Sequence, residues 1–499
     1  MRVDTVGAEQ AQRTGLRPSL SQRIRFSAVD EAAYLLDSVW EPWSVHVEAR
    51  VHAALDESRL AAAVAAALAR HPMARARKAV SGIRASLEWE LLPEAEMDVL
   101  QVVQAPSDDA LDAVRADLQS LFVPLNEAPP LRVWLVHHPG GDVVMLNVNH
   151  AAADGIGSLR ILRSIARAYA AQADPVPDLD PLCMRDPAAF LARVNSQRSV
   201  RRGLRLFREL GEAVGTWTRV AAEEGKDRPG YGLHLVALTP EQTTAVAEGR
   251  RVGVTINDLL IAALHLAVDG WNAEHRMSAG RIGVVMPVNL RPRAWWHEVV
   301  GNFSLMVPVA SSPGDRDDPA AILAAVSRRT RLVKQDHRAA LLLGLLTRVQ
   351  RLPARLRRAL AWLFSRDQLM QTAMLSNLGG IDEPLCFGPE VGEAVEVWFS
   401  PPAKMPLGLG LGAVTAAGRL HLVFRYRHPL FSKQAAARFA DRYVTVLLAL
   451  CEHDEENPNW PPVDGLGAPF GRKRQRGSGW NELPAPNRVT GRPAGKVSP

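Results

Sequence analysis

Apolar and polar positions recur along the first part of the chain in helical and strand patterns. Residues 55–77 are rich in alanine with apolar positions three and four apart, which predicts a helix. Residues 85–92 alternate between apolar and polar, as a half-buried strand does. Residues 131–150 predict two strands around a Pro-Gly-Gly turn, and residues 157–172 return to helical spacing.

The second part of the chain repeats this mixture after an interruption. Prolines at 175, 177 and 181 break the pattern, and a basic stretch at 191–225 has helical spacing. Further predicted elements follow, with strands at 233–238, 282–290, 301–309 and 420–427 and helices at 255–271, 320–336, 339–365 and 433–452. We therefore predict an α/β (α+β) fold of two halves, 21–175 and 231–465, joined by a helical linker at 176–230.

Length and composition are those of a globular protein with more than one core. The chain has 499 residues, of which 47% are hydrophobic and 22% charged. Its three cysteines are far apart, which argues against a disulfide framework or a zinc site and favours a reducing compartment. The first residues lack the apolar stretch of a signal peptide, and the longest apolar runs, such as 339–346, are too short to span a bilayer. We expect a cytoplasmic protein, at most peripheral at a membrane.

The net charge of +6 comes from the end of the chain. Residues 466–499 contain seven arginines and lysines and one glutamate, so the rest of the chain is formally neutral. This tail is rich in proline, glycine and charge, and we expect it and residues 1–20 to be disordered. Because the positive charge is confined to a tail, we do not expect nucleic acid as a partner.

Residues 149–158, "NHAAADGIGS", carry the chemistry that the chain displays most clearly. His150 ends a predicted strand, where a neutral imidazole could take a proton from a group that attacks a carbonyl. Asp154 could pair with a cation on another segment, and Gly155 could adopt a positive φ and leave space for a ligand. A three-residue pattern is weak support alone. No HExxH-like spacing accompanies it, so we expect no metal.

Other stretches extend this motif into a family resemblance that covers roughly residues 25–450. In order along the chain they are "RHPMARAR" (70–77), "PPLRVWLV" (129–136), "TINDLLIAALHLAV" (255–268), "MPVNLRPR…VGNFSLMVPV" (286–309) and "LSNLGGI" (375–381). Together with HxxxDG they resemble the superfamily of chloramphenicol acetyltransferase, peptide-synthetase condensation domains, mycobacterial polyketide-associated acyltransferases and bacterial wax ester synthase/diacylglycerol acyltransferases. The resemblance is strongest to the wax ester synthase branch.

The resemblance implies a fold and a role for each matched residue. It implies two chloramphenicol-acetyltransferase-like sandwich halves that form a pseudo-dimer around a central tunnel. His150 matches the general base, and Asp154 matches a structural aspartate whose partner would be Arg291. The remaining matched positions are secondary candidates for bracing the site, binding substrate or holding the oxyanion: Asn257, Asp258, Gly301, Asn302, Ser376 and Asn377. These six secondary candidates are equally compatible with helix-capping and turn positions.

Two departures from the family pattern affect the functional prediction. Asn149 stands where the common form has a first histidine, and we include it among possible substrate contacts. The late Asp-Phe-Gly-Trp-Gly motif of condensation domains is absent, which favours the stand-alone acyltransferases. The prediction is O-acyl transfer from acyl-CoA or an acyl-carrier protein to an alcohol, with the thioester as co-substrate and no bound cofactor.

Alternatives to this function remain open from the sequence. One is a condensation-like enzyme that forms amides on carrier-bound substrates, and another is a catalytically silent acyl-binding protein. Two arginine-rich helical stretches suit either an anionic membrane surface or an ordinary solvated face. Their arginines are Arg198, Arg201, Arg202, Arg205 and Arg208 in the first and Arg348, Arg351, Arg355, Arg357 and Arg358 in the second.

Overall fold

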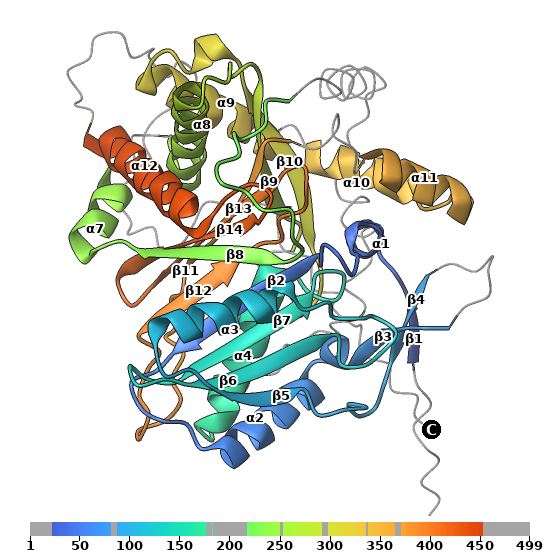
Figure 1. Ribbon diagram of the computed structural model, residues 1–499. Coiled ribbons are helices and arrows are strands. Elements are labelled where there is room, and N and C mark those ends of the chain that lie inside the picture. The colour runs from blue at the N-terminus through green and yellow to red at the C-terminus, as the bar shows by residue number, and fades with distance from the viewer. Residues whose placement is uncertain are drawn as a thin grey trace, which may run out of the picture.

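The computed structural model describes most of the body of the chain. The described residues are 22–80, 87–175, 182, 217–249, 253–291, 298–335, 338–364 and 371–452. The tails for which we predict disorder, the arginine-rich stretch around Arg198–Arg208 and most of the linker lie outside these residues. The observed architecture is two lobes, each a sheet with helices packed on it (Figure 1).

The N-terminal lobe is built on a five-stranded sheet with the order β12-β2-β7-β6-β5. Its strands are β2 (Ser44–Arg50), β5 (Leu100–Gln104), β6 (Leu131–His137), β7 (Val143–Asn149) and β12 (Glu396–Ser400). Helices α2 (Glu57–Arg70) and α4 (Gly155–Tyr169) lie together on one face, and α3 (Asp108–Ser120) lies on the other. Because both faces are covered, every residue of β7 is buried.

The C-terminal lobe is built on a six-stranded sheet with the order β10-β9-β11-β13-β14-β8. Its strands are β8 (Tyr231–Ala237), β9 (Ile282–Asn289), β10 (Ser304–Ser311), β11 (Ala373–Gly380), β13 (Leu409–Ala416) and β14 (Arg419–Arg427). Its helices are α7 (Pro240–Glu248), α8 (Ile256–Glu274), α9 (Pro319–Gln335) and α12 (Lys433–Glu452), with a short 3-10 turn at Pro313–Asp315. Helix α8 is apolar on most sides because α9 and α12 both pack against it.

The two lobes share elements, so the predicted boundaries do not divide the chain cleanly. Strand β12 belongs by sequence to the second half but pairs with β2 of the first, from Glu396 opposite Arg50 to Ser400 opposite His46. In the other direction, α1 (Ala28–Leu36) packs against helices of the second half. The exchange covers the edge of β2, which would otherwise present unpaired backbone groups.

The small elements complete the description. Strands β1 (Gln22–Arg25), β3 (Ala76–Lys78) and β4 (Glu88–Leu91) form a third sheet beside a 3-10 turn at Pro72–Arg75. Helices α10 (Arg338–Val349) and α11 (Ala354–Phe364) extend away from the C-terminal lobe above α1 (Figure 1). The prediction of one helix over 339–365 is wrong, because Pro353 ends the first helical run and starts a second.

The predicted helix at 191–225 is also wrong at its described end. From Trp217 onward the backbone is extended, with isolated bridges to Arg281 and from Glu223 to Phe431. The Ala221 N–H donates to Asn272, and the Ala221 carbonyl accepts from the Trp271 indole. Because the backbone groups of Ala221 bond to side chains of α8, they are not available for the hydrogen bonds of a local helix. Among the described residues, none of the helices combines the length and apolar character needed to cross a bilayer.

Candidate active site

The backbone that positions His150 is fixed by the end of strand β7. Register in the sheet places Asn149 opposite Ser44, so the His150 N–H reaches the Trp43 carbonyl at 3.1 Å. The His150 ring stacks near the Trp43 ring, with 6.4 Å between centroids. The strand ends where the chain turns toward α4, which places the imidazole at the interface of the two lobes.

The environment of His150 suits a proton acceptor. Only 6% of the residue is exposed, and burial lowers the pKa of the imidazole below its ordinary value. Its Nδ1 is enclosed and has no hydrogen-bond partner among the described residues. The ring is therefore neutral at pH 7, the form that a general base requires.

The structure brings Asp154 and Arg291 together across the two lobes. The Arg291 guanidinium donates from Nη1 to Asp154 Oδ2 at 2.6 Å and from Nη2 to Oδ1 at 2.8 Å. The Asp154 carboxylate also accepts hydrogen bonds from the backbone N–H groups of Gly157 and Phe303, both at 2.9 Å, which makes four in all. Burial opposes ionisation of Asp154, but Arg291 and these N–H groups outweigh it and lower the carboxyl pKa. Asp154 is thus an N-cap of α4 and one half of a clasp between lobes.

Gly301 and Asn302 belong to this clasp and do not line the cavity described below. The Gly301 carbonyl accepts from Arg291 Nη2 at 2.9 Å and from the Asp154 N–H at 3.2 Å. The Asn302 amide donates to the Val29 carbonyl at 3.3 Å and accepts from the Ser304 N–H at 3.2 Å. Both residues support the geometry around Asp154, and their polar groups are used within the protein.

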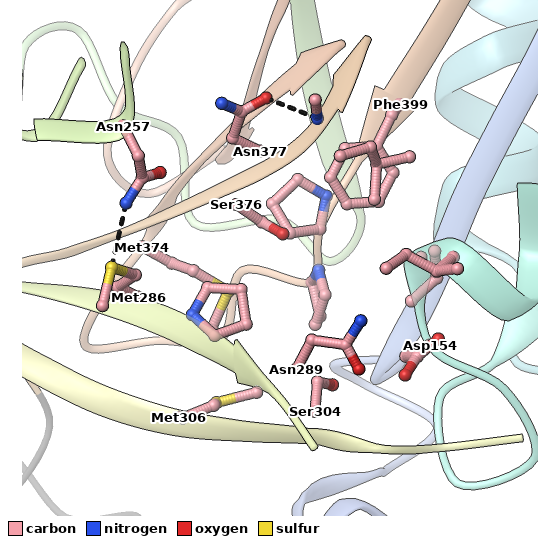
Figure 2. A pocket seen from close by; sticks show the side chains of 18 of the residues that line it. Asp154, Asn257, Met286, Asn289, Ser304, Met306, Met374, Ser376, Asn377 and Phe399 are labelled. Carbon is pink, nitrogen blue, oxygen red and sulfur yellow. Dashed lines mark hydrogen bonds between the residues drawn. The ribbon is translucent and has the colours of Figure 1, made fainter. Parts of the chain in front are cut away.

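A cavity of about 290 Å³ separates the lobes beside His150. The N-terminal lobe contributes Val45, His150, Asp154, Gly155 and Ile156 to its wall. The rest of the wall is Thr255, Ile256, Asn257, Met286, Pro287, Asn289, Ser304, Met306, Met374, Ser376, Asn377, Leu378, Gly379, Gly380, Phe399, Pro401 and Pro402. Figure 2 shows methionines from three strands gathered on one side of this space. Its wall combines apolar side chains with eight polar or charged residues, so it could hold an apolar group and orient a polar one.

Three of the secondary candidates lie in this cavity wall, and Asp258 does not. Ser376 and Asn377 come from β11, whose pairing with β13 shifts register just after Asn377. Asn257 lies at the start of α8, where its amide approaches Met286 Sδ at 2.9 Å (Figure 2). Asp258 instead forms the capping box of α8 with Thr255.

The expectation for Gly155 is wrong in its reason. Gly155 lines the cavity but does not have a positive φ, and the space on its Cβ side is filled by protein. A Cβ built there would lie 2.7 Å from the Leu378 side chain and 2.8 Å from that of Phe399. The glycine is required because α4 begins in close contact with β11 and β12.

Asn149 is a structural residue. Its amide nitrogen donates to Asp37 at 2.8 Å and to the Val123 carbonyl at 2.9 Å, and its oxygen accepts from the Ala151 N–H at 3.0 Å. It does not line the cavity. Burial raises the pKa of Asp37 to about 6. The asparagine therefore fixes the turn that carries His150, and its substrate-contact prediction is not supported by this placement.

Sequence reasoning missed most of the apolar wall. Met286, Met306 and Met374 lie on adjacent strands, and Phe399 lies on the exchanged strand β12. Nothing in local periodicity distinguishes these residues from core positions, because strand order is needed to bring them together. Within the described residues there is no group of three or more metal-ligating side chains.

Comparison with known proteins places the chain in a family. No family model matches it. A Mycobacterium tuberculosis protein described as uncharacterized, Rv2305 in strain H37Rv and MT2362 in strain CDC 1551, is 36% identical over 439 residues, covering 86% of this chain and all of the relative. The chain belongs to the Rv2305 family. The match spans the complete length of the relative.

Solved structures show the fold that this family adopts. The first condensation domain of the calcium-dependent antibiotic synthetase, in complex with a substrate analogue, superposes with a TM-score of 0.64 at 14% identity, covering 86% of this chain and 96% of that one. The condensation domain of the polyketide synthase MokA gives 0.61 at 13% identity, covering 87% and 98%. The epimerization domain of tyrocidine synthetase B gives 0.58 at 17% identity, covering 87% and 98%. The predicted pseudo-dimer of two chloramphenicol-acetyltransferase-like lobes is confirmed.

Proposed function

We propose that the protein transfers an acyl group from a thioester to an alcohol, with His150 as general base. The observation that carries the proposal is the neutral His150 imidazole in the wall of the cavity between the lobes, on a turn held by the Asp154–Arg291 pair. The likeness to condensation domains supports the class of reaction as a fold analogy. The relatives in the family carry no assigned activity that would narrow the substrate.

The chemical steps use residues that the cavity contains. His150 takes the proton of the acceptor hydroxyl as its oxygen attacks the thioester carbonyl. The resulting oxyanion would be stabilised by polar groups across the cavity, for which Ser376, Asn377 and Asn257 are the candidates. When the carbon–sulfur bond breaks, the thiolate takes the proton back from the imidazolium. No acyl-enzyme forms, and every proton is accounted for.

The cavity also supports an aliphatic acyl group as substrate. Met286, Met306 and Met374 supply flexible, polarizable surface that adapts to a chain. At about 290 Å³ the cavity is near the lower end of ordinary ligand pockets. We therefore favour acyl chains over bulky peptidyl groups.

Mass spectrometry of products is the decisive experiment. The protein is incubated with a panel of acyl-CoA thioesters and with alcohol and amine acceptors, beside His150→Ala. We expect ester products and a loss of about 10²–10⁴ in rate for the variant. Amide products would select the condensation-like alternative. Thioester binding without turnover would select a silent acyl-binding protein, and a fully active variant would remove His150 from the mechanism.

We further propose that α10 and α11 rest on an anionic lipid surface. Leu356 is 53% exposed and Trp362 59% exposed, on the outward side of α11, whereas Arg357 faces the body and pairs with Glu31 at 2.9 Å. The four other arginines of this stretch, Arg348, Arg351, Arg355 and Arg358, are exposed. Exposed aromatic, aliphatic and cationic side chains together suit the lipid interface.

Vesicle sedimentation tests this surface. The protein should sediment with vesicles containing phosphatidylglycerol and not with phosphatidylcholine alone, and Leu356→Ser with Arg355→Ser should release it. Arg276→Ser, on a loop after α8, is the matched control. Equal sedimentation of the double variant and the parent would show that another surface, or none, binds lipid.

A further inference from the structure

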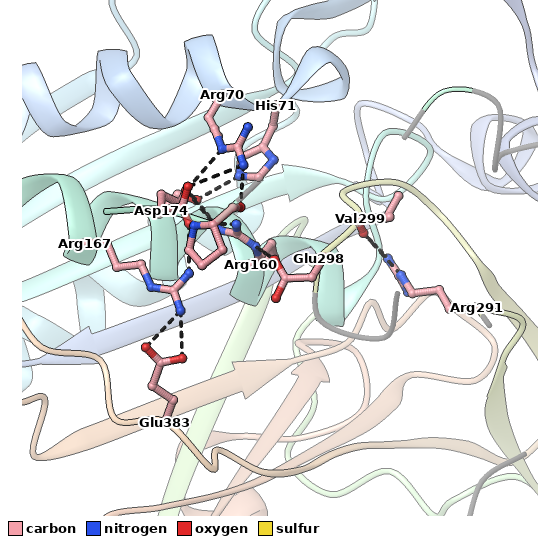
Figure 3. Close-up of polar contacts among 11 residues, drawn as sticks. Arg70, His71, Arg160, Arg167, Asp174, Arg291, Glu298, Val299 and Glu383 are labelled. Atoms are coloured by element: carbon pink, nitrogen blue, oxygen red, sulfur yellow. Dashed lines mark hydrogen bonds and ion pairs between the residues drawn. The ribbon is translucent and has the colours of Figure 1, made fainter. Parts of the chain in front are cut away.

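Charged side chains gather around the later turns of α4 (Figure 3): Arg160, Arg163 and Arg167 are buried, whereas the carboxylates of the cluster are partly exposed. Asp174 is its centre, accepting from Arg160 at 2.7 Å, Arg167 at 2.9 Å and Ser164 at 2.6 Å. These contacts offset the burial of Asp174 and lower its pKa to about 2, so it is ionised. The cluster is therefore a network of full charges.

Each carboxylate of the cluster is already engaged. Glu383 accepts both of its bonds from Arg167 Nη2, at 2.9 and 2.7 Å, and Glu298 accepts from Arg160 Nε at 3.2 Å. His71 bonds to Ser164, and burial with the nearby Arg160 charge lowers its pKa to about 3, so it adds no positive charge at pH 7. The cluster holds four arginines, at 70, 160, 163 and 167, against three carboxylates. One positive charge is unmatched.

Arg163 is the arginine of the cluster that has no close ion-pair partner: burial lowers the pKa of its guanidinium, and the more distant Glu383 and Glu298 only partly offset this. Only 8% of the residue is exposed, and its Nε is enclosed without a hydrogen-bond partner. No ion pair joins Arg163 to any residue of the described part of the chain, where the neighbouring Arg160 and Arg167 have partners. Burying an unpaired guanidinium costs free energy, and an anionic ligand would recover it.

The position of Arg163 relates it to the cavity. Ile156, which lines the cavity, is seven residues earlier on α4, so the two side chains share a helix face about 10 Å apart along the axis. Leu378 touches α4 at Gly155, and Glu383 touches it at Arg167. The segment 378–383 therefore runs beside α4 from the cavity to the cluster.

The middle of this seam is open. Gly379 and Gly380 line the cavity, and a Cβ built on either would meet no atom within 4 Å. The chain at these two glycines, of which Gly380 is exposed to solvent, therefore leaves space at the edge of the cavity. The reactive end of a slender ligand that enters here would lie near His150 and its other end near Arg163.

We infer that Arg163 binds the phosphate of a phosphopantetheine arm that enters the cavity along the seam between α4 and residues 378–383. The inference rests on the proposed thioester chemistry and adds the side from which the donor arrives. Free CoA and the arm of a carrier protein share this phosphate. Arginine suits it, because its planar donors match phosphate oxygens.

Calorimetric binding to the full-length protein tests the inference without requiring turnover. The probes are 4′-phosphopantetheine and pantetheine, which differ only by the phosphate. The parent should bind the phosphorylated probe about tenfold more tightly or better, and Arg163→Gln should abolish that difference while leaving pantetheine binding unchanged. The control is Arg355→Gln, an exposed arginine on α11, which should keep the discrimination.

Thermal unfolding separates a binding role from a structural one. Because Arg163 has no ion-pair partner in the described chain, Arg163→Gln should leave the melting temperature unchanged or raise it, whereas Arg167→Gln should lower it. A decrease for Arg163→Gln equal to that for Arg167→Gln would show that the chain itself already pairs it. That result, or equal affinity of the parent for both probes, overturns the inference.

The same measurements distinguish this inference from the proposed function. If Arg163 is needed for tighter binding of the phosphorylated probe but no product forms, the binding site for the phosphopantetheine arm is supported and the transferase activity is not. Product formation with unaltered discrimination in Arg163→Gln would leave the transferase and remove the arm site. CoA as a third probe identifies the source, since tighter binding than phosphopantetheine indicates free CoA and equal binding indicates a carrier protein.

Discussion

The two ends of α4 use similar side chains with different results. At its start, Asp154 accepts four hydrogen bonds and is matched by Arg291 alone. Along its later turns Arg160 and Arg167 surround Asp174, and Arg163 remains unmatched. At the start of α4 each buried charge has an ion-pair partner, and the pair holds the two lobes together. At the later turns Arg163 has no close ion-pair partner in the described part of the protein. The comparison is the reason why we place a ligand at the second end and none at the first.

The largest expected effect comes from breaking the ion pair at the start of α4. Arg291→Ala leaves the Asp154 carboxylate buried without its cation, and we expect a loss of about 3–5 kcal/mol in the free energy of unfolding. Because Arg291 also holds the Gly301 carbonyl, the lobes should separate more readily. Urea denaturation followed by tryptophan fluorescence measures the change.

The control for Arg291→Ala is a double variant that also lacks the Asp154 carboxylate. Asp154→Ala together with Arg291→Ala removes both charges, so the double variant should be less destabilised than the sum of the single variants. Arg355→Ala, which alters an exposed arginine, should leave stability within about 0.5 kcal/mol of the parent. Strict additivity of the two single changes would mean that the pair is not coupled.

The next prediction tests how closely the start of α4 packs against β11 and β12. Gly155→Ala places a methyl group 2.7 Å from Leu378 and 2.8 Å from Phe399, inside contact distance of both. We expect a loss of about 1–3 kcal/mol in the free energy of unfolding, as for overpacked cores. Gly380→Ala is the matched control, since its added methyl group meets open space. Equal melting temperatures of the two variants would contradict the close approach of α4 to β11 and β12.

The two ends also differ in how far sequence could predict them. His150, Asp154 and Arg291 were found because the resemblance gives them roles in a fixed order. Arg163 could not be predicted in this way, because an arginine on a helix is ordinarily exposed. Its environment also depends on Glu383, which lies 220 residues later in the chain and bonds to Arg167 instead. Pairing over such separations is set by tertiary packing, which local spacing does not encode.

The fold shows the same division. Strand β7 follows from a short apolar run, and helix α4 from its apolar spacing and its cap, each within a few residues. The exchange of β12 into the first sheet does not, because its partner β2 lies some 350 residues earlier and nothing in Glu396–Ser400 specifies which sheet it joins. Sequence therefore predicted the two-lobed class but not the strand that joins the lobes.

The last expected effect, a change in a pH slope, concerns a second positive charge at the end of α4 where Arg163 lies. Burial, with Arg160 nearby, lowers the pKa of His71 to about 3, while an unfolded chain has an ordinary histidine pKa near 6.5. Between these values the unfolded state binds a proton that the folded state does not, so stability falls as pH falls, by about 1.4 kcal/mol per unit. His71→Gln should make the slope of unfolding free energy between pH 6 and pH 4 shallower by up to that amount. His52→Gln, at an exposed position, should not change the slope through this mechanism. A parallel pH dependence for the parent and His71→Gln would mean that the cluster tolerates another cation, and Arg163 would then need no anion beside it.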